Sequence, residues 1–373
     1  MDDIVRAVLE REDQTERKSA PALKHHSIDS ELKKLIEKKF VDIMIVGCGG
    51  AGNNTLNRLH QIGIEGTKSV AINTDAQDLL ESYADEKVLI GEEITRGLGA
   101  GSDPKLGEES ARESKMEIRN VIGKSNMVFI TCGLGGGTGT GTVPVVAEIS
   151  KSIGALTIAI VTLPFDMEGD NRIFNARSGL LKLSKLVDTL IVIPNEKLLE
   201  MVPDVPIDQA FRVADEILVG AMKGITELIT KPGLINLDFA DVRSVMSDGG
   251  LSMIGVGFDD SHQRVEKAVY NALTNPLLAV DIQDATGALI NVTGGPDLTL
   301  KESQDIVNMI RKNLSPNAKI IWGASVTNSV KAPLGVMVVV TGVQHSVEDI
   351  FDEVKCHEEV PRKEIVGLGI DMF

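Results

Sequence analysis

Six short apolar segments, rich in β-branched residues, alternate with stretches of helical periodicity between residues 40 and 194. In chain order they read FVDIMIV, SVAIN, KVLI, NMVFITC, ALTIAIVTL and TLIVIP. Strands that alternate with helices form parallel sheets, because each parallel connection must cross over the sheet. Segments that are apolar along their whole length suit a sheet covered on both faces. The sequence therefore predicts an α/β fold with a Rossmann-like parallel sheet.

A long amphipathic helix is expected after this sheet. It begins after Pro206, ends at Lys231-Pro232-Gly233, and is about 24 residues or roughly 36 Å long. Its apolar residues recur at helical spacing and are Ile207, Ala210, Phe211, Ala214, Ile217, Leu218, Ala221, Met222, Ile225 and Leu228. A helix of this length can connect two domains.

Beyond the helix, the segments LSMIGVGF, ALINVTG, KIIWGASV and GVMVVVTGV are typical of strands, with helices expected at about 262–275 and 301–313. They predict a smaller α+β domain with a mixed sheet. We therefore divide the chain into a helical N-terminal extension at 1–37, a first domain at 38–206, a connecting helix at 207–231, a second domain at 232–356 and a C-terminal tail at 357–373.

Charge and composition restrict the partners of this chain. The formal net charge of -16 disfavours nucleic acid, since binding to phosphates depends on Lys and Arg. The three cysteines fit neither a disulfide framework nor a zinc site, which favours a reducing cytoplasm. The charged N-terminus does not resemble a signal peptide, and apolar stretches such as Val336–Val340 are too short to span a membrane. We expect a cytoplasmic protein without direct membrane insertion.

Glycine-rich loops follow two of the predicted strands. The first, GCGGAGNN at 47–54, is a G-x-G-x-x-G followed by a helix, whose N–H groups and dipole favour phosphate. With Asp75 at the end of the second strand, this loop also fits a dinucleotide-binding Rossmann fold. The loop alone leaves both readings open.

The second loop, GLGGGTGTG at 133–141, separates these alternatives. Its many N–H donors and hydroxyl groups suit a triphosphate, and a dinucleotide fold has no use for such a run at its fourth strand. A third loop, GLGAGSDP at 97–104, is placed to close over the terminal phosphate. Gly123-Lys124-Ser125 lacks the upstream glycine of a P-loop, and no N-K-x-D guanine motif occurs.

Together these segments resemble the FtsZ family, the tubulin-like GTPases of the prokaryotic division ring, and in particular its archaeal members. The resemblance covers about residues 38–356 and rests on GGGTGTG at 135–141, GCGGAGNN at 47–54, PFDMEG at 164–169 and NLDFADV at 236–242. It implies a GTP-binding domain, a GTPase-activating second domain, and a GTPase that polymerises head-to-tail into cell-division filaments. GTP, GDP and Mg²⁺ are the implied ligands.

The resemblance also implies a set of nucleotide-binding residues. Glu168 and Arg172 would contact the ribose and base side of GTP, and Asn195, Phe211 and Asp215 would surround guanine. A carboxylate accepts hydrogen bonds from guanine N1–H and N2–H₂, whereas adenine has no such pair of donors. The remaining implied residues are Gly49, Gly50, Ala51, Gly52, Asn53, Asn73, Asp75, Ala100, Gly101, Gly135, Gly136, Gly137, Thr138, Gly139, Thr140 and Gly141. No metal-ligand spacing identifies a protein metal site.

Asp238 and Asp241 lie beyond the far end of the long helix, about 36 Å from its nucleotide end. They cannot act on GTP bound to their own chain, and the ordinary interpretation is a solvated loop or a helix cap. The resemblance implies instead that this loop completes the nucleotide site of the next subunit. Asp238 and Asp241 would then be the catalytic residues that polarise the attacking water.

The chain ends in GLGIDMF, which resembles a docking peptide for a membrane-anchoring division protein of the FtsA or SepF kind; the alternative is a terminal strand or helix that packs on the body. Such a tail would place the protein at the mid-cell ring, on the inner face of the membrane.

The function of a polymerising GTPase has two alternatives. One is a dinucleotide oxidoreductase, supported only by the first loop and Asp75, and the other is a tubulin-like scaffold that binds GTP without hydrolysing it. The intact Asp238 and Asp241 argue against the scaffold.

Overall fold

The computed structural model describes residues 41–201, 206–230, 237–278, 281–327 and 332–355. The N-terminal extension and the C-terminal tail expected from the sequence lie outside the described residues, so these two predictions are not tested here. No helix in the described part is both long and apolar enough to cross a membrane.

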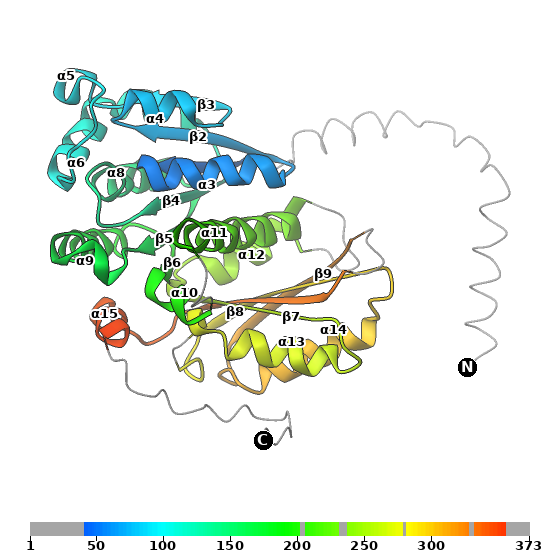
Figure 1. Ribbon diagram of the computed structural model, residues 1–373. Helices are drawn as coiled ribbons and strands as arrows, with labels where there is room; N and C mark the ends of the chain where they lie inside the picture. Colours follow the sequence, from blue (N-terminus) through cyan, green and yellow to red (C-terminus); the bar gives the residue numbers. More distant parts are fainter. Residues whose placement is uncertain (1–40, 202–205, 231–236, 279–280, 328–331, 356–373) are drawn as a thin grey trace, which may run out of the picture. The chain divides into compact units, whose positions relative to one another are not determined.

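Ten strands form one sheet in the order β3-β2-β1-β4-β5-β6-β7-β10-β8-β9 (Figure 1). They are β1 (Ile43–Cys48), β2 (Thr67–Asn73), β3 (Glu86–Leu89), β4 (Met127–Gly133), β5 (Leu156–Leu163), β6 (Thr189–Pro194), β7 (Gly250–Asp259), β8 (Gly287–Gly294), β9 (Lys319–Val326) and β10 (Leu334–Thr341). The first six pair in parallel, as the sequence predicts. Every residue of β1, β5 and β6 is buried, which explains why these strands are apolar throughout.

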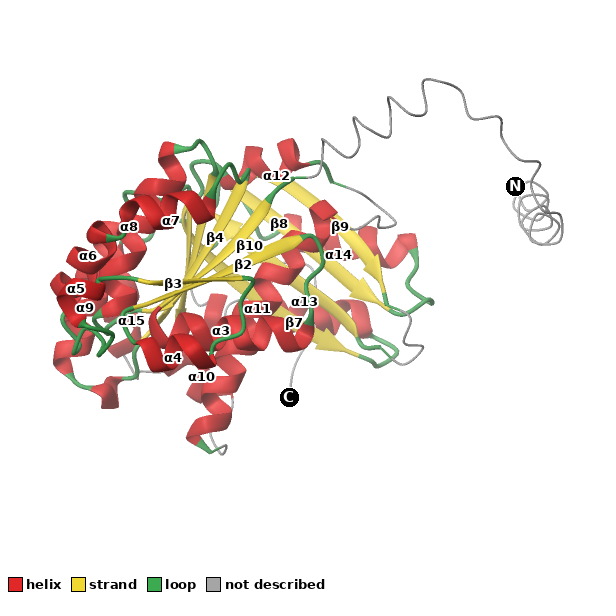
Figure 2. Cartoon of the chain, turned by 90° about the horizontal axis from the view of Figure 1, so that it is seen from above, coloured by secondary structure: helices red, strands yellow, loops and turns green. Residues whose placement is uncertain are grey.

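Helices cover both faces of this sheet (Figure 2). The helical elements up to the end of the first domain are α3 (Gly49–Ile62), α4 (Ala76–Glu81), α5 (Glu92–Thr95), α6 (Pro104–Glu113), α7 (Lys115–Ile122), α8 (Thr138–Ser152), η1 (Asp166–Glu168), α9 (Asp170–Leu183) and α10 (Asn195–Met201). Because side chains alternate along a strand, Ile158 of β5 packs with the α3 face and Ala159 with the α8 face. The parallel strands therefore contribute alternate side chains to two apolar cores, one on each face of the sheet.

The long helix α11 (Ile207–Thr230) has the 24 residues predicted from its flanking prolines. Its buried stripe, which includes Leu218, Met222 and Ile225, packs in the same core as α3. An ion pair between Arg58 of α3 and Glu216 of α11, at 2.6 Å, adds a contact at the surface. The helices α11 and α3 thus pack side by side.

The second half of the chain extends the sheet. Its helical elements are α12 (Phe239–Met246), α13 (Arg264–Leu273), η2 (Pro276–Leu278), α14 (Leu300–Arg311) and α15 (Val347–Lys355). The sheet here is mixed, as predicted, because β10 is antiparallel to β7 and β8 whereas β9 is parallel to β8. Since β7 pairs in parallel with β6, the two halves share one continuous sheet, a connection that the sequence does not reveal.

A candidate nucleotide-binding site

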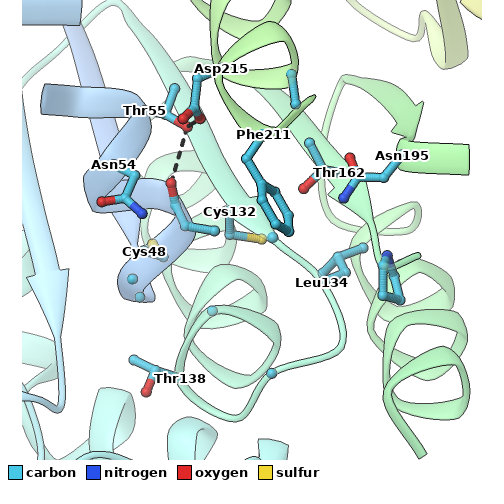
Figure 3. Close-up of a pocket in the computed structure, with 18 of the residues that line it drawn as sticks. Cys48, Asn54, Thr55, Cys132, Leu134, Thr138, Thr162, Asn195, Phe211 and Asp215 are labelled. Carbon is cyan, nitrogen blue, oxygen red and sulfur yellow. Dashed lines mark hydrogen bonds between the residues drawn. The ribbon is translucent and has the colours of Figure 1, made fainter. Parts of the chain in front are cut away.

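A cavity of about 500 Å³ opens at the carboxyl ends of β1, β4, β5 and β6, where parallel sheets bind their ligands. Its glycine end is formed by the loops that lead into α3 and α8, and its other end by α10 and α11. In the view of Figure 3, Thr138 lies at one end and Asp215 at the other. The volume is typical of a small-molecule site.

Two helix N-termini at the glycine end lack side-chain caps. Cys48 and Gly137 are the N-cap residues of α3 and α8, and neither makes a capping hydrogen bond through its side chain. Neither helix has an acidic residue in its first turn. Unsatisfied N–H groups and the positive end of each helix dipole are thus available to an anion at the same place.

The glycines of the two loops serve different structural needs. Gly49 has a φ of 69°, and a side chain there would approach the backbone nitrogen of Gly139 to 2.8 Å. Added Cβ atoms would likewise meet backbone at Gly52, Gly137 and Gly141. Nothing lies within 4 Å of a Cβ added at Gly136, and this residue lines the cavity. Most of the predicted glycines therefore permit close packing of the loops, whereas Gly136 faces open space.

Aromatic and polar side chains define the other end. The ring of Phe211 is held edge-on by Phe165, with ring centroids 5.3 Å apart, and 43% of Phe211 is exposed. Asn195, the first residue of α10, is buried, and its Oδ1 has no hydrogen-bond partner. A planar ring bearing hydrogen-bond donors would satisfy both side chains.

Asp215 adds an acceptor to this end. The Thr55 hydroxyl donates to its Oδ1 at 2.9 Å. Burial raises the pKa of Asp215 to about 6, although the Thr55 hydrogen bond and the charge of Arg58 lower it. Glu168 and Arg172, also in the lining, form an ion pair between η1 and α9.

Other predicted binding residues lie outside the cavity lining. Asp75 is the N-cap of α4 and accepts hydrogen bonds from the Gln77 and Asp78 N–H groups. The remaining residues outside the lining are Gly52, Asn53, Asn73, Ala100, Gly101, Gly135, Thr140 and Gly141. Asn53 and Asn73 both donate to the carboxylate of Asp78. The side chains of Asp75, Asn53 and Asn73 therefore make local contacts, and contact of this whole set with a nucleotide remains a prediction.

Asp238 and Asp241 are far from the cavity. Asp238 caps α12, accepting a hydrogen bond from the Asp241 N–H at 2.8 Å, and both residues are exposed. Arg243 of α12 donates to the Gly154 carbonyl, just before β5 begins. The cavity lies at the other end of β5, an eight-residue strand of roughly 26 Å. The two carboxylates and the cavity therefore lie at opposite ends of the strands, on opposite edges of the sheet in this sense.

Comparisons with known proteins agree with this architecture. The Tubulin/FtsZ family, GTPase domain, matches residues 42–203, and the FtsZ family, C-terminal domain, matches residues 250–344. Cell division protein FtsZ 1 of Methanocaldococcus jannaschii is 59% identical over 320 residues, which are 86% of this chain and 88% of the relative. The chain belongs to the FtsZ family. FtsZ 1 of Thermococcus kodakarensis is 54% identical over 371 residues, or 99% of each chain.

Solved structures of relatives show the same fold. An empty FtsZ dimer of M. jannaschii superposes with a TM-score of 0.82 at 58% identity, covering 86% of this chain and 93% of that chain. CetZ2 of Haloferax volcanii, at 21% identity and a TM-score of 0.73, covers 84% and 97% and shares the fold. As an FtsZ-family member, the protein is a tubulin-like GTPase of the cell-division cytoskeleton. The oxidoreductase alternative is therefore wrong.

Ten cavity-lining residues were not predicted individually, although Cys48, Asn54, Gly133 and Leu134 lie within the predicted glycine-rich loops. The ten are Cys48, Asn54, Thr55, Cys132, Gly133, Leu134, Thr162, Pro164, Ala214 and Leu218. Thr162 and Pro164 follow the rule that ligands bind beyond the carboxyl ends of parallel strands, which could have identified them. Ala214 and Leu218 lie three and seven residues after Phe211, so they share its helix face. The pKa of the Cys48 and Cys132 thiols is raised by burial, which fits a packing role.

Proposed function

We propose that this protein is a self-assembling GTPase that polymerises head-to-tail and hydrolyses GTP at the contact between two subunits. The observation that carries the proposal is the placement of the cavity and of Asp238 and Asp241 at opposite edges of one sheet. Within one chain these groups cannot meet. In a head-to-tail contact, the α12 edge of one subunit faces the cavity of the next.

The cavity suits GTP at both ends. The triphosphate would lie against the uncapped N-termini of α3 and α8, where Gly136 leaves room. Guanine would stack on Phe211 and donate through N1–H and N2–H₂ to Asp215 and to the unpartnered Oδ1 of Asn195. Adenine lacks this pair of donors, so guanine specificity follows from the acceptors.

Mg²⁺ would accompany the triphosphate and offset its charge. Among the described residues that line the cavity, the carboxylates are Glu168 and Asp215, and neither lies on the glycine loops. No group of three His, Cys, Asp or Glu side chains in the described part could hold a metal. We therefore expect Mg²⁺ to be held by phosphate oxygens and water, as this ion commonly is.

Hydrolysis needs a polarised water in line with the terminal phosphate. Asp238 and Asp241 of the incoming subunit are exposed carboxylates on a fixed helix end, and they would orient and polarise that water. A contact between unlike surfaces propagates into a filament unless its rotation closes a ring. The FtsZ dimer known for the M. jannaschii relative supports self-association.

A division ring also requires attachment to the membrane. We expect the tail at 357–373, outside the described residues, to bind a membrane anchor of the FtsA or SepF kind. The filaments would then lie at mid-cell on the inner face of the membrane. The predicted boundaries of the five parts of the chain also remain proposals.

The decisive experiment records the GTPase rate per molecule against protein concentration, together with light scattering, and uses ATP as the control nucleotide. We expect a concentration threshold that appears in both signals with GTP and in neither with ATP. A rate per molecule that stays constant from dilute to concentrated protein would contradict the shared site. Assembly with GTP but without turnover would support the alternative of a scaffold that binds GTP without hydrolysing it.

A further inference from the structure

One side-chain amide on α9 connects the glycine loop at 133–141 to the loop at 97–104. The Nδ2 group of Asn175 donates to the Ser102 carbonyl at 3.2 Å and to the Gly135 carbonyl at 3.3 Å. Asn175 follows Arg172 by three residues, so both side chains leave the same face of the helix. Arg172 lines the cavity itself, whereas Asn175 lies outside the lining and contacts these two loops.

The orientation of this amide follows from its partners. An NH₂ group supplies two hydrogens, which is the number that two carbonyl acceptors require. A flipped amide would place its oxygen against the two carbonyl oxygens, an arrangement without any donor. The contacts therefore need the donor group of an asparagine side chain at this position.

Gly135 is held by side chains on both sides. Its N–H donates to the Thr140 hydroxyl at 2.9 Å, and its C=O accepts from Asn175. Its φ of 107° requires glycine, and a Cβ there would come within 3.0 Å of the Arg172 carbonyl. The carbonyl of Gly135 and the N–H of Gly136 belong to one planar trans peptide and point in opposite directions. Fixing the carbonyl therefore fixes the direction of the Gly136 N–H.

The loop at 97–104 is bound to the same region. A Cβ on Gly137 would meet the Asp103 nitrogen at 2.8 Å and the Ala100 Cβ at 2.9 Å, so this loop packs directly on the glycine loop. Ser102, whose carbonyl accepts from Asn175, has a φ of 62°, which is unfavourable for a residue other than glycine. The Asn175 amide thus connects two loops that are rich in glycine and therefore have few side chains of their own to hold them.

We propose that Asn175 is a positioning residue for GTP, because it fixes the Gly135–Gly136 peptide and joins it to the 97–104 loop. The proposal rests on the phosphate-binding role given above to the glycine end. A peptide between two glycines turns over at little steric cost, because neither residue carries a Cβ. Without the amide, the Gly136 N–H loses its fixed direction, and the triphosphate loses a donor that was already oriented.

The test compares Asn175→Ala and Asn175→Asp with the wild type in competition against a fluorescent GTP analogue. Asn175→Asp keeps the side-chain shape but removes both donors. We expect roughly tenfold weaker GTP binding in both variants, from the loss of two hydrogen bonds, with guanosine binding unchanged because the guanine end is untouched. Asn120→Asp, at an exposed position of α7, is the matched control and should bind GTP as the wild type does.

The thermal melting of the nucleotide-free variants completes the test. Equal loss of GTP and guanosine binding, together with a lower Tm, would indicate a general structural role and overturn the proposal. Wild-type GTP affinity in both variants would overturn it as well. If the wild type itself bound no GTP, the proposed function would fail, and that result is distinguishable because it does not depend on Asn175.

Discussion

Burial and the proposed guanine contact make opposite demands on Asp215. Burial raises its pKa from 3.8 to about 6, whereas the proposed contact requires the ionised carboxylate as an acceptor. A proton bound to Asp215 must therefore leave before GTP binds. We expect GTP affinity to be level above pH 7 and to fall by about tenfold per pH unit below pH 6. Calorimetric titration between pH 5 and 8 measures this directly.

Asp215→Asn provides the control for this pH dependence. The variant keeps the size of the side chain but has no proton to lose, so its GTP affinity should be low at pH 7 and show no step near pH 6. If GTP affinity changed near pH 6 in the same way in both proteins, the pH dependence would come from another group and not from Asp215.

The raised pKa of Asp215 has the reverse effect on the stability of the nucleotide-free protein. A group whose folded-state pKa exceeds its unfolded value stabilises the fold below the unfolded value of 3.8, and this contribution is lost as the pH rises through about 6. We therefore expect Asp215→Asn to have a higher Tm than the wild type at pH 7 and a similar Tm near pH 4. A lower Tm at pH 7 would contradict the burial cost assigned to this carboxylate.

At the scale of elements, two glycines around the start of α8 should respond differently to the same substitution. A Cβ at Gly141 would lie 2.2 Å from the Pro104 carbonyl and 2.5 Å from the Glu108 nitrogen, both on α6. A Cβ at Gly136 would meet nothing within 4 Å. We expect Gly141→Ala to lower the free energy of unfolding by about 3 kcal/mol, and Gly136→Ala to leave it nearly unchanged. Urea denaturation gives both values.

Nucleotide binding should show the opposite order. Gly136→Ala adds a methyl group to the cavity wall, so the folded variant should bind GTP at least tenfold more weakly than the wild type. Any Gly141→Ala protein that remains folded should retain GTP binding, because Gly141 lies outside the lining. GTP binding by Gly136→Ala as strong as that of the wild type would contradict the proposed position of the triphosphate in this part of the cavity.

The elements themselves could be predicted from the sequence because their signals are local. Strands that are completely buried are apolar throughout, and the spacing of apolar residues identifies α11 as a helix whose length follows from Pro206 and Lys231-Pro232-Gly233. The pairing of β6 with β7 was not predictable, since strand order depends on contacts between distant segments. Asp75 shows where prediction of the site from the sequence is limited, because a carboxylate after a strand can contact a ribose or cap a helix equally well. Asn175 has no motif, and only the folded chain brings Ser102 and Gly135 to it.

At the scale of the whole molecule, the proposed function makes turnover a property of two copies, because Asp241 is separated from the cavity. Asp241→Ala alters an exposed side chain at the start of α12, so folding and GTP binding should be unchanged. The GTPase rate at concentrations that support assembly should fall at least a hundredfold, the usual effect of removing a general base. Single-variant rates cannot, however, distinguish an intermolecular role from a defect within one chain.

Mixing Asp241→Ala with Gly136→Ala, at a GTP concentration too low to fill the Gly136→Ala cavity, makes that distinction. Asp241→Ala retains an intact cavity, whereas Gly136→Ala retains an intact Asp241, so a contact that joins these two edges contains one complete site. If the copies mix at random in a head-to-tail filament, roughly a quarter of contacts are complete, and the mixture should recover up to about a quarter of the wild-type rate. The double variant Gly136→Ala/Asp241→Ala, mixed with either single variant, should recover nothing. Light scattering establishes that the copies assemble together, and assembly without recovery would show that Asp241 acts within its own chain.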